Sequence, residues 1–228
     1  MSEHQGFPGE ALNAVGLNRQ AVFDVATLPE PIRSTLGTTS GQLILIGHAG
    51  KQLWQAVQAS GIASSDPIDD FTIASVQRWF ADFLADHNYQ ILYPGEHPVS
   101  LQALGKLAGW HQPSPFMLGI DSEWGTWYAY RAVLLADTNF LPSTAVDRNN
   151  PCANCQDKPC ITRCPAGALE GEQFSLNKCI SYRRQADSRC QFTCLARISC
   201  PVGVEHRYDE AQLRHTYAIS LQAIRQYG

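Results

Sequence analysis

Eight cysteines are confined to one stretch of this 228-residue chain, from Cys152 to Cys200. A small secreted protein held together by disulfides usually carries its cysteines throughout its length. Cysteines gathered in one segment of a chain long enough to bury a core are more typical of a metal or cluster site. Residues 150–200 contain seven Lys and Arg against four Asp and Glu, whereas the whole chain has a net charge of −4. This local positive surplus favours an anionic group inside the segment.

The cysteine spacing is close to that of bacterial ferredoxins, in which C-x2-C-x2-C-x3-C-P supplies three ligands to one [4Fe–4S] cluster and the fourth ligand to another. The first run here has two more residues before its third cysteine, and Cys-Pro recurs at Cys164 and Cys200. Two loops that exchange their last cysteine would hold two clusters. The spacing therefore predicts one cluster on Cys152, Cys155, Cys160 and Cys200. It predicts a second cluster on Cys164, Cys179, Cys190 and Cys194.

Two other uses of the cysteines stay open. A pair of four-cysteine zinc sites needs the same residue type, and the pair Cys152-x2-Cys155 fits zinc well. Disulfides are a weaker alternative, because residues 1–10 lack the basic stretch and following apolar run of a secretion signal. The repeated Cys-Pro ending favours iron–sulfur clusters over zinc.

The remaining composition excludes several classes of protein. A net charge of −4 argues against a general nucleic-acid binder. No apolar run approaches the roughly 20 residues that a membrane-spanning helix needs. We therefore expect a soluble, cytoplasmic protein with no nucleic-acid partner and no membrane partner.

The residues before the cysteines predict interleaved helices and strands, and hence a layered α+β domain. The apolar run 41–47, bounded by glycines, predicts a buried strand. Asp66 as a cap and Pro67 as the first helical residue predict an amphipathic helix over 67–87. Its core residues are expected to include Trp79, Phe80 and Phe83. The other predicted elements are helices at 51–60, 100–108 and 209–227 and a strand at 89–93.

Strands at 116–120 and 126–136 are expected to form a hairpin, with Gly125 in its turn. Arg131 falls on the largely apolar second strand. A charge is costly to bury alone, so Arg131 needs a partner. The candidates are a ligand anion or one of the carboxylates of Asp121, Glu123 and Asp137. The nearby histidines, His48 and His111, are expected to be ordinary loop residues.

The sequence resembles two families that handle cobalamin. The stretches from Cys160 to Leu169 and from Cys179 to Tyr182 resemble the dicluster ferredoxin module of epoxyqueuosine reductases, which use cobalamin and two [4Fe–4S] clusters. The earlier part is similar to the CblC cobalamin-processing family. That similarity lies in the hairpin 120–135, the helix start 65–69 and the strand 42–47.

The resemblance implies a flavin-reductase or nitroreductase-like domain of sheet and helices over residues 1–148, which binds a corrinoid base-off. It implies a small dicluster ferredoxin-like module over 149–204 and a closing C-terminal helix over 205–228. Arg131 matches the family arginine that contacts glutathione or another anionic group near the cobalt. Aromatic residues that would line the corrin are Trp110, Trp124, Trp127, Tyr128 and Tyr130.

Two departures limit what the resemblance implies. Lys106 stands where eukaryotic CblC proteins have a pocket histidine, and the Asp-Tyr-His motif of epoxyqueuosine reductases is not found. Reduction of a tRNA base is therefore not expected. We expect an oxidoreductase that passes electrons from two [4Fe–4S] clusters to a corrinoid and receives them from reduced ferredoxin, flavodoxin or another donor. The alternative is a ferredoxin-like electron-transfer protein whose N-terminal domain binds no cobalamin, or binds a flavin.

Overall fold

The computed structural model describes residues 4–145, 149–170 and 173–227. The chain divides into two compact units. The N-terminal unit comprises Met1–Gly109 and Tyr128–Asp147, and the C-terminal unit comprises Trp110–Trp127 and Arg148–Gly228. The sequence-based boundary at residue 148 differs from this division, because residues 110–127 group with the cysteine segment rather than with the strands around them.

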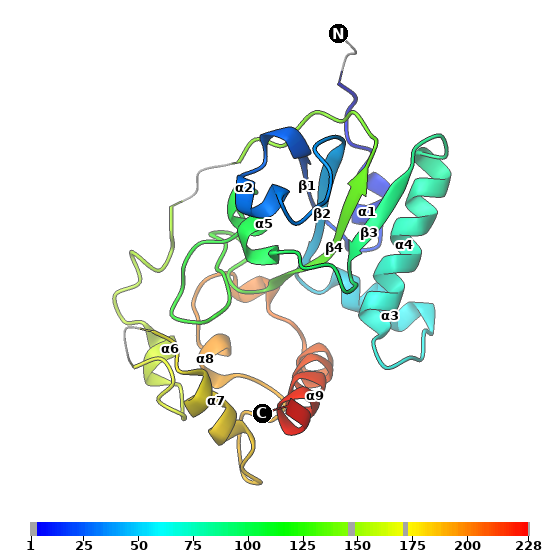
Figure 1. Ribbon diagram of the computed structural model, residues 1–228. Coiled ribbons are helices and arrows are strands. Elements are labelled where there is room, and N and C mark those ends of the chain that lie inside the picture. The colour runs from blue at the N-terminus through cyan, green and yellow to red at the C-terminus, as the bar shows by residue number, and fades with distance from the viewer. Residues whose placement is uncertain (1–3, 146–148, 171–172, 228) are drawn as a thin grey trace. The chain divides into compact units, whose positions relative to one another are not determined.

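The N-terminal unit is built on a four-stranded sheet in the order β1-β2-β4-β3, with every pair antiparallel (Figure 1). Its strands are β1 (Arg19–Asp24), β2 (Gln42–Ala49), β3 (Tyr89–Tyr93) and β4 (Tyr128–Ala136). All eight residues of β2 are buried, which agrees with the apolar run that predicted this strand. A central strand covered on both faces has this continuous apolar pattern. The sheet thus forms the interior of the N-terminal unit.

Helices cover this sheet, and α3 and α4 lie beside one another against it (Figure 1). The helical segments are α1 (Glu10–Ala14), η1 (Val25–Thr27), α2 (Glu30–Arg33), α3 (Gln52–Ser60), α4 (Pro67–Phe83) and α5 (Leu101–Leu107). Trp79 of α4 is buried, and its indole N–H donates to the Pro8 carbonyl over 2.8 Å. Phe83 was expected in the core but is 52% exposed, because the helix ends there and Leu84 turns inward instead.

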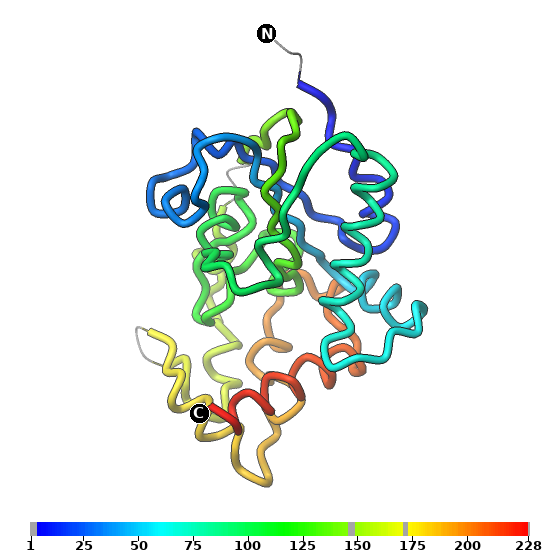
Figure 2. The backbone as a smooth tube through the Cα atoms, turned by 45° about the vertical axis from the view of Figure 1, so that its right-hand side comes forward, coloured from blue at the N-terminus to red at the C-terminus, as the bar shows by residue number. Residues whose placement is uncertain are grey.

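The C-terminal unit contains several short helices and one long one. Its helical segments are α6 (Pro159–Thr162), α7 (Leu176–Arg183), α8 (Leu195–Ile198), η2 (Val204–His206) and α9 (Glu210–Tyr227). Six of the cysteines of this unit lie in the connecting loops, Cys160 lies in α6 and Cys179 in α7. The long closing helix α9 runs beside the cysteine-bearing segment (Figure 2). Arg183 at the end of α7 donates to Ser220 of α9 over 2.9 Å, so α9 is tied to that segment.

The predicted hairpin is wrong. Residues 116–120 form no strand: Ile120 makes an isolated bridge to Gln112, and Asp121 makes another to Gly125 across the predicted turn. The Asp121 side chain accepts hydrogen bonds from the backbone N–H groups of Glu123 and Trp124, which makes a compact side-chain-capped turn. Strand β4 pairs with β2 and β3 instead.

Gly125 nevertheless has the positive φ that its place in the turn required. A Cβ at Gly125 would meet the carbonyl of Val202, so the close approach of these backbones also requires glycine.

Among the described residues, no helix is long and apolar enough to span a membrane.

Gly105 of α5 allows Tyr130 of β4 to pack directly against the helix. A Cβ at residue 105 would overlap the Tyr130 hydroxyl and ring. Overpacking of this kind costs about 1–3 kcal/mol. We expect Gly105→Ala to lower the free energy of unfolding by that amount in urea denaturation followed by tryptophan fluorescence. Gly6→Ala is the matched control, because its Cβ would have no neighbour within 4 Å; equal stability of the two variants would contradict this packing.

Candidate metal centres and the Arg131 cluster

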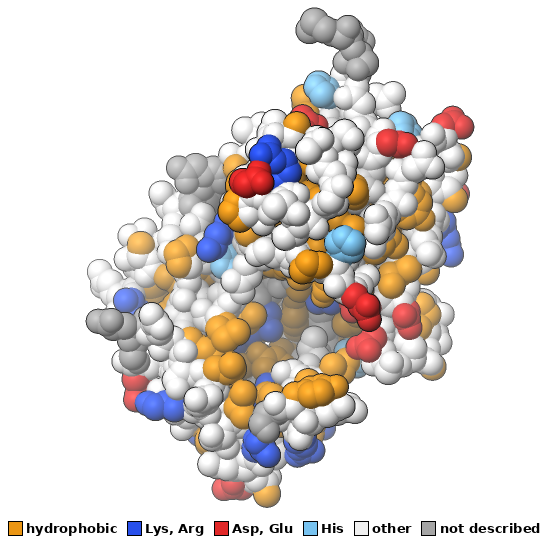
Figure 3. Space-filling model, viewed as in Figure 1, with side chains coloured by type: hydrophobic (Ala, Val, Ile, Leu, Met, Phe, Trp, Pro, Cys, Tyr) orange, Lys and Arg blue, Asp and Glu red, His pale blue; other side chains and the backbone are white. Residues whose placement is uncertain are grey.

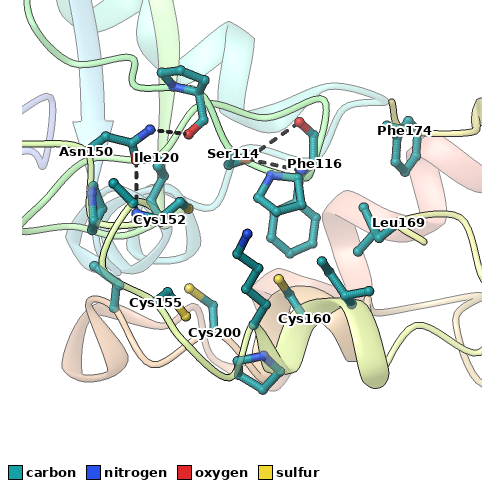
Figure 4. Close-up of a pocket in the computed structure, with 18 of the residues that line it drawn as sticks. Ser114, Phe116, Ile120, Asn150, Cys152, Cys155, Cys160, Leu169, Phe174 and Cys200 are labelled. Carbon is teal, nitrogen blue, oxygen red and sulfur yellow. Dashed lines mark hydrogen bonds between the residues drawn. The ribbon is translucent and has the colours of Figure 1, made fainter. Parts of the chain in front are cut away.

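The structure gathers four cysteines around one cavity of the C-terminal unit. The cavity has a volume of about 640 Å³, and the cysteines that line it are Cys152, Cys155, Cys160 and Cys200. Figure 4 shows Cys155, Cys160 and Cys200 along one side of this cavity, below Asn150. The Asn150 side chain accepts from the Cys152 N–H over 2.9 Å and donates to the Pro113 carbonyl over 3.0 Å. These two bonds position the loop that carries Cys152.

The remaining four cysteines line a second cavity of the same unit, with a volume of about 290 Å³. They are Cys164, Cys179, Cys190 and Cys194. Cys194 caps α8, because its sulfur accepts a hydrogen bond from the Arg197 backbone N–H over 3.4 Å. The two cavities therefore separate the cysteines into the same two groups of four that the spacing predicts as ligand sets.

Burial makes these thiols reluctant to ionise. It raises the pKa of the Cys152 thiol to about 11, and the nearby Cys200, Cys160 and Cys155 add to the rise. Burial also raises the pKa of Cys179 to about 11, with a further contribution from Cys194. Metal ligation requires thiolates, so the bound group must supply enough positive charge to displace these protons. Iron–sulfur clusters and zinc both do so.

A zinc ion and an iron–sulfur cluster would place different demands on the sulfurs. Within the described residues, no group of three or more His, Cys, Asp or Glu side chains is arranged to hold a metal ion. A zinc ion binds each thiolate at about 2.3 Å and so draws all four sulfurs around one point. In a [4Fe–4S] cube each cysteine binds a different iron, and the four sulfurs stand further apart. Each cavity is lined by four cysteines, the number that either kind of site needs.

Arg131 of β4 has protein partners that differ from those predicted. Its Nε donates to Nδ1 of His48 over 3.0 Å, and its Nη1 lies 3.6 Å from Oδ1 of Asp69. The candidates Asp121, Glu123 and Asp137 are not these partners. His48 is not a loop residue either, since it lies within β2 and is 1% exposed. Asp69 lies in the first turn of α4. It is far from Arg131 in the sequence, and the fold brings the two side chains together.

The aromatic residues predicted to line a corrin fall in different units. Tyr128 and Tyr130 belong to the N-terminal unit, where their rings meet edge to face at 5.9 Å. Trp110, Trp124 and Trp127 belong to the C-terminal unit. There Trp124 stacks on His206 with ring centroids 4.1 Å apart, and Trp127 is fully buried. A cavity of about 340 Å³ in the N-terminal unit is lined by residues 40–41, 88–90 and 135–137, which include none of these aromatic residues and not Arg131.

Sequence reasoning missed two buried cations near the second group of cysteines. Arg183 donates from Nε to the Cys190 carbonyl over 3.1 Å. The Arg197 guanidinium lies 4.4 Å from the centroid of the Trp127 ring and 5.0 Å from that of Tyr208. The positive surplus of the segment indicated that such cations exist, but it did not indicate which of them are buried.

Comparison with known proteins gives a structural likeness and no sequence match. No protein-family model matches the chain, and no curated protein matches its sequence. A crystal structure of epoxyqueuosine reductase with a tRNA-Tyr stem loop matches with a TM-score of 0.57 and 15% identity, over 90% of this chain and 67% of that one. The enzyme from Bacillus subtilis matches with a TM-score of 0.54 and 13% identity, over 88% and 66% of the two chains.

The chain shares the fold of epoxyqueuosine reductase. It spans about two thirds of the length of those structures. The Caenorhabditis elegans B12-trafficking protein CblC matches with a TM-score of 0.44 and 13% identity, over 91% of this chain and 88% of that one. At these identities the likeness concerns the fold alone. The expectation of a mixed helix-and-sheet protein is confirmed, while its finer assignment to nitroreductase-like and ferredoxin-like parts remains a prediction.

The Asp69–Arg131 pair makes a testable electrostatic prediction. Burial raises the pKa of the Asp69 carboxyl above its ordinary value, and the Arg131 guanidinium opposes that rise. Arg131→Gln removes the opposing charge, so the pKa of Asp69 should rise further. The measurement is a carbon-13 NMR titration of the aspartate carboxyls. The pKa of Asp137, lowered chiefly by a hydrogen bond from Asn88, serves as the internal control. An unchanged or lower pKa for Asp69 would show that the two groups do not interact.

Proposed function

We propose that this protein is an iron–sulfur oxidoreductase that holds two [4Fe–4S] clusters and uses them to reduce a base-off corrinoid. The observation that carries the proposal is the pair of cavities, each lined by four cysteines, in a chain with the epoxyqueuosine reductase fold. The solved structures with this fold are named as reductases. Thiols whose pKa is raised by burial support a metal-containing group in each cavity, and two buried arginines near the second group support an anionic one there.

Each group of residues has its own role in the proposed function. Cys152, Cys155, Cys160 and Cys200 hold one cluster, and Cys164, Cys179, Cys190 and Cys194 hold the other. When bound, the clusters supply single electrons and the corrinoid supplies a reducible cobalt. The protein contributes the thiolates, excludes water from the buried sulfurs of Cys160, Cys190 and Cys200, and places cations beside them.

The corrinoid is assigned to the N-terminal part of the chain, residues 1–148, and the clusters to residues 149–204. Arg131 is the residue proposed to contact an anionic group of the corrinoid or of its substrate. Its guanidinium is oriented by His48 and Asp69 and is already held away from bulk water. The aromatic residues Trp110, Trp124, Trp127, Tyr128 and Tyr130 remain predicted contacts of the corrin.

The proposed reaction is reduction, decyanation or dealkylation of a cobalamin, or reduction of a small substrate by it, with reduced ferredoxin or flavodoxin as the donor. The net charge of the chain argues against an enzyme that acts on tRNA. Binding to phosphate backbones is driven by positive charge, and this chain carries −4 overall. The rival reading, an electron-transfer protein without a corrinoid or with a flavin, shares the clusters and differs in the N-terminal ligand.

Metal and sulfide analysis tests the clusters. Anaerobically purified protein should contain about eight iron atoms and eight inorganic sulfides per chain, as two [4Fe–4S] clusters require. Cys179→Ser should remove or perturb one cluster and leave the other, which EPR of the reduced protein would report. Thr162→Ser, at an exposed position of α6, should retain both. Purified protein that contains zinc and no inorganic sulfide would contradict the proposal.

An absorption titration with hydroxocobalamin tests the corrinoid. Binding should shift the spectrum to the base-off form, and Arg131→Gln should weaken binding about tenfold, or about 1.4 kcal/mol, through loss of a charge-assisted contact. Arg78→Gln, which removes an exposed arginine of α4, should bind like the wild type. No spectral shift at high micromolar hydroxocobalamin would exclude the corrinoid. Binding of FMN in its place would favour the flavin alternative, and tight binding of a tRNA stem loop would contradict the argument from charge.

A further inference from the structure

Two buried arginines distinguish the second group of cysteines from the first. Arg183 ends α7 and Arg197 lies in α8, and each is 7% exposed. Other Lys and Arg side chains are spread over the surface in Figure 3. A charge on the surface is screened by water and salt, whereas a buried charge acts on its neighbours at much lower effective dielectric. These two cations are therefore the ones that matter most to a group bound nearby.

The partners of Arg197 are neutral. The guanidinium donates to the carbonyl and to the hydroxyl of Thr126, the latter over 3.2 Å. It also shares a hydrogen bond with the Tyr217 hydroxyl. The rings of Trp127 and Tyr208 lie against it. Every one of these groups fixes the position of the charge, and none of them cancels it.

The partners of Arg183 are neutral as well. Its guanidinium donates to the carbonyl of Cys190 over 3.1 Å, to the Ser220 hydroxyl over 2.9 Å and to the Tyr217 carbonyl over 2.9 Å. Over the ranges that the structure describes, neither arginine has a carboxylate partner. Two buried positive charges therefore lack a counter-charge among the side chains. An uncompensated buried charge is strongly unfavourable.

The sulfurs of the second group supply the missing negative charge. The charge of Arg197 acts on Cys194, whose sulfur also accepts the Arg197 backbone N–H. The charge of Arg183 acts on Cys179 and Cys190. Four thiolates around a cluster would thus complete a buried arrangement of opposite charges.

The first group of cysteines has weaker cationic surroundings. Lys158, which acts on Cys152, is exposed. Arg207 donates to the Cys200 carbonyl over 3.0 Å and is half-buried. The ligand set is four cysteines in both cavities, so the ligands themselves do not distinguish two clusters. The difference lies in the buried positive charge.

We propose that Arg183 and Arg197 make the cluster on Cys164, Cys179, Cys190 and Cys194 the more easily reduced of the two. This inference rests on the proposed function in one respect, namely that both clusters are present. A cluster gains one negative charge with each electron that it accepts from a donor, and a fixed cation stabilises the reduced form more than the oxidised form. The first electron delivered to the protein therefore resides on this cluster, and the arginines act as positioning residues for charge.

The experiment is a dithionite redox titration followed by EPR on protein shown to hold both clusters. Wild type should give two resolved midpoint potentials. Arg197→Gln removes the charge and should lower the higher midpoint potential without moving the lower one. Arg197→Lys keeps the charge and should preserve most of the separation between the two potentials. Arg163→Gln is the matched control, because Arg163 adjoins Cys164 in the chain but is exposed; it should leave both potentials in place.

Serine substitutions assign the two potentials. Cys179→Ser should shift or abolish the higher one, and Cys152→Ser the lower one. If Arg197→Gln does not retain both clusters, Arg183→Gln and Arg183→Lys provide the same comparison. Coincident potentials in the wild type, or a higher potential that belongs to the Cys152 cluster, would overturn the inference and leave the proposed function standing. Iron and sulfide analysis of the same samples separates these outcomes from absence of a cluster, which would overturn both.

Discussion

The clusters proposed for the C-terminal unit impose one electrostatic constraint: partly buried sulfurs must be ionised to bind metal, and ionised sulfurs are unstable when buried alone. Burial raises the pKa of six of the cysteines: Cys152, Cys160, Cys179, Cys190, Cys194 and Cys200. Positive charge must therefore come from the bound groups and from arginines held inside the fold. One buried apolar cluster of this unit joins Cys160, Leu169 and Ala196, with Phe116, Ile161, Cys164, Phe174 and Cys194 packed against it. Because cysteines of both groups belong to this cluster, binding of the proposed groups would be linked to folding of the unit.

The N-terminal unit is organised in the opposite way. Its apolar core joins β2, β4 and the buried face of α4, and it needs no bound group to hold it together. Arg131 of β4 differs from its neighbours, because it places a charge on a strand of mostly apolar residues. His48 and Asp69 orient that charge, yet burial raises the pKa of Asp69 despite the nearby guanidinium. Burial of Asp69 and the charge of Arg131 thus act on the Asp69 pKa in opposite directions.

Local patterns in the sequence predicted several elements well. The apolar run of β2, the Asp66-Pro67 start of α4 and the closing helix α9 each depend on periodicity or capping within a few residues. The predicted strand at 116–120 was wrong because Ile120 pairs with Gln112 rather than with the strand that follows, and β4 begins only at Tyr128. The partners of Arg131 were missed because Asp69 and His48 lie far from it in sequence. The cysteine groups were predictable because the spacing itself encodes the exchange between the two loops.

Spacing does not encode which of two chemically identical sites holds an electron more tightly. The net charge of the segment counts Lys158 and Arg197 equally, although one is exposed and the other is enclosed by Thr126, Trp127 and Tyr208. That enclosure is a tertiary property, since residues 126–127 precede the cysteines in the chain and Tyr208 follows them. Trp127, which was expected to contact the corrin, instead lies against the Arg197 guanidinium together with Tyr208. Burial of charge, rather than its amount, is what makes the two cysteine groups different.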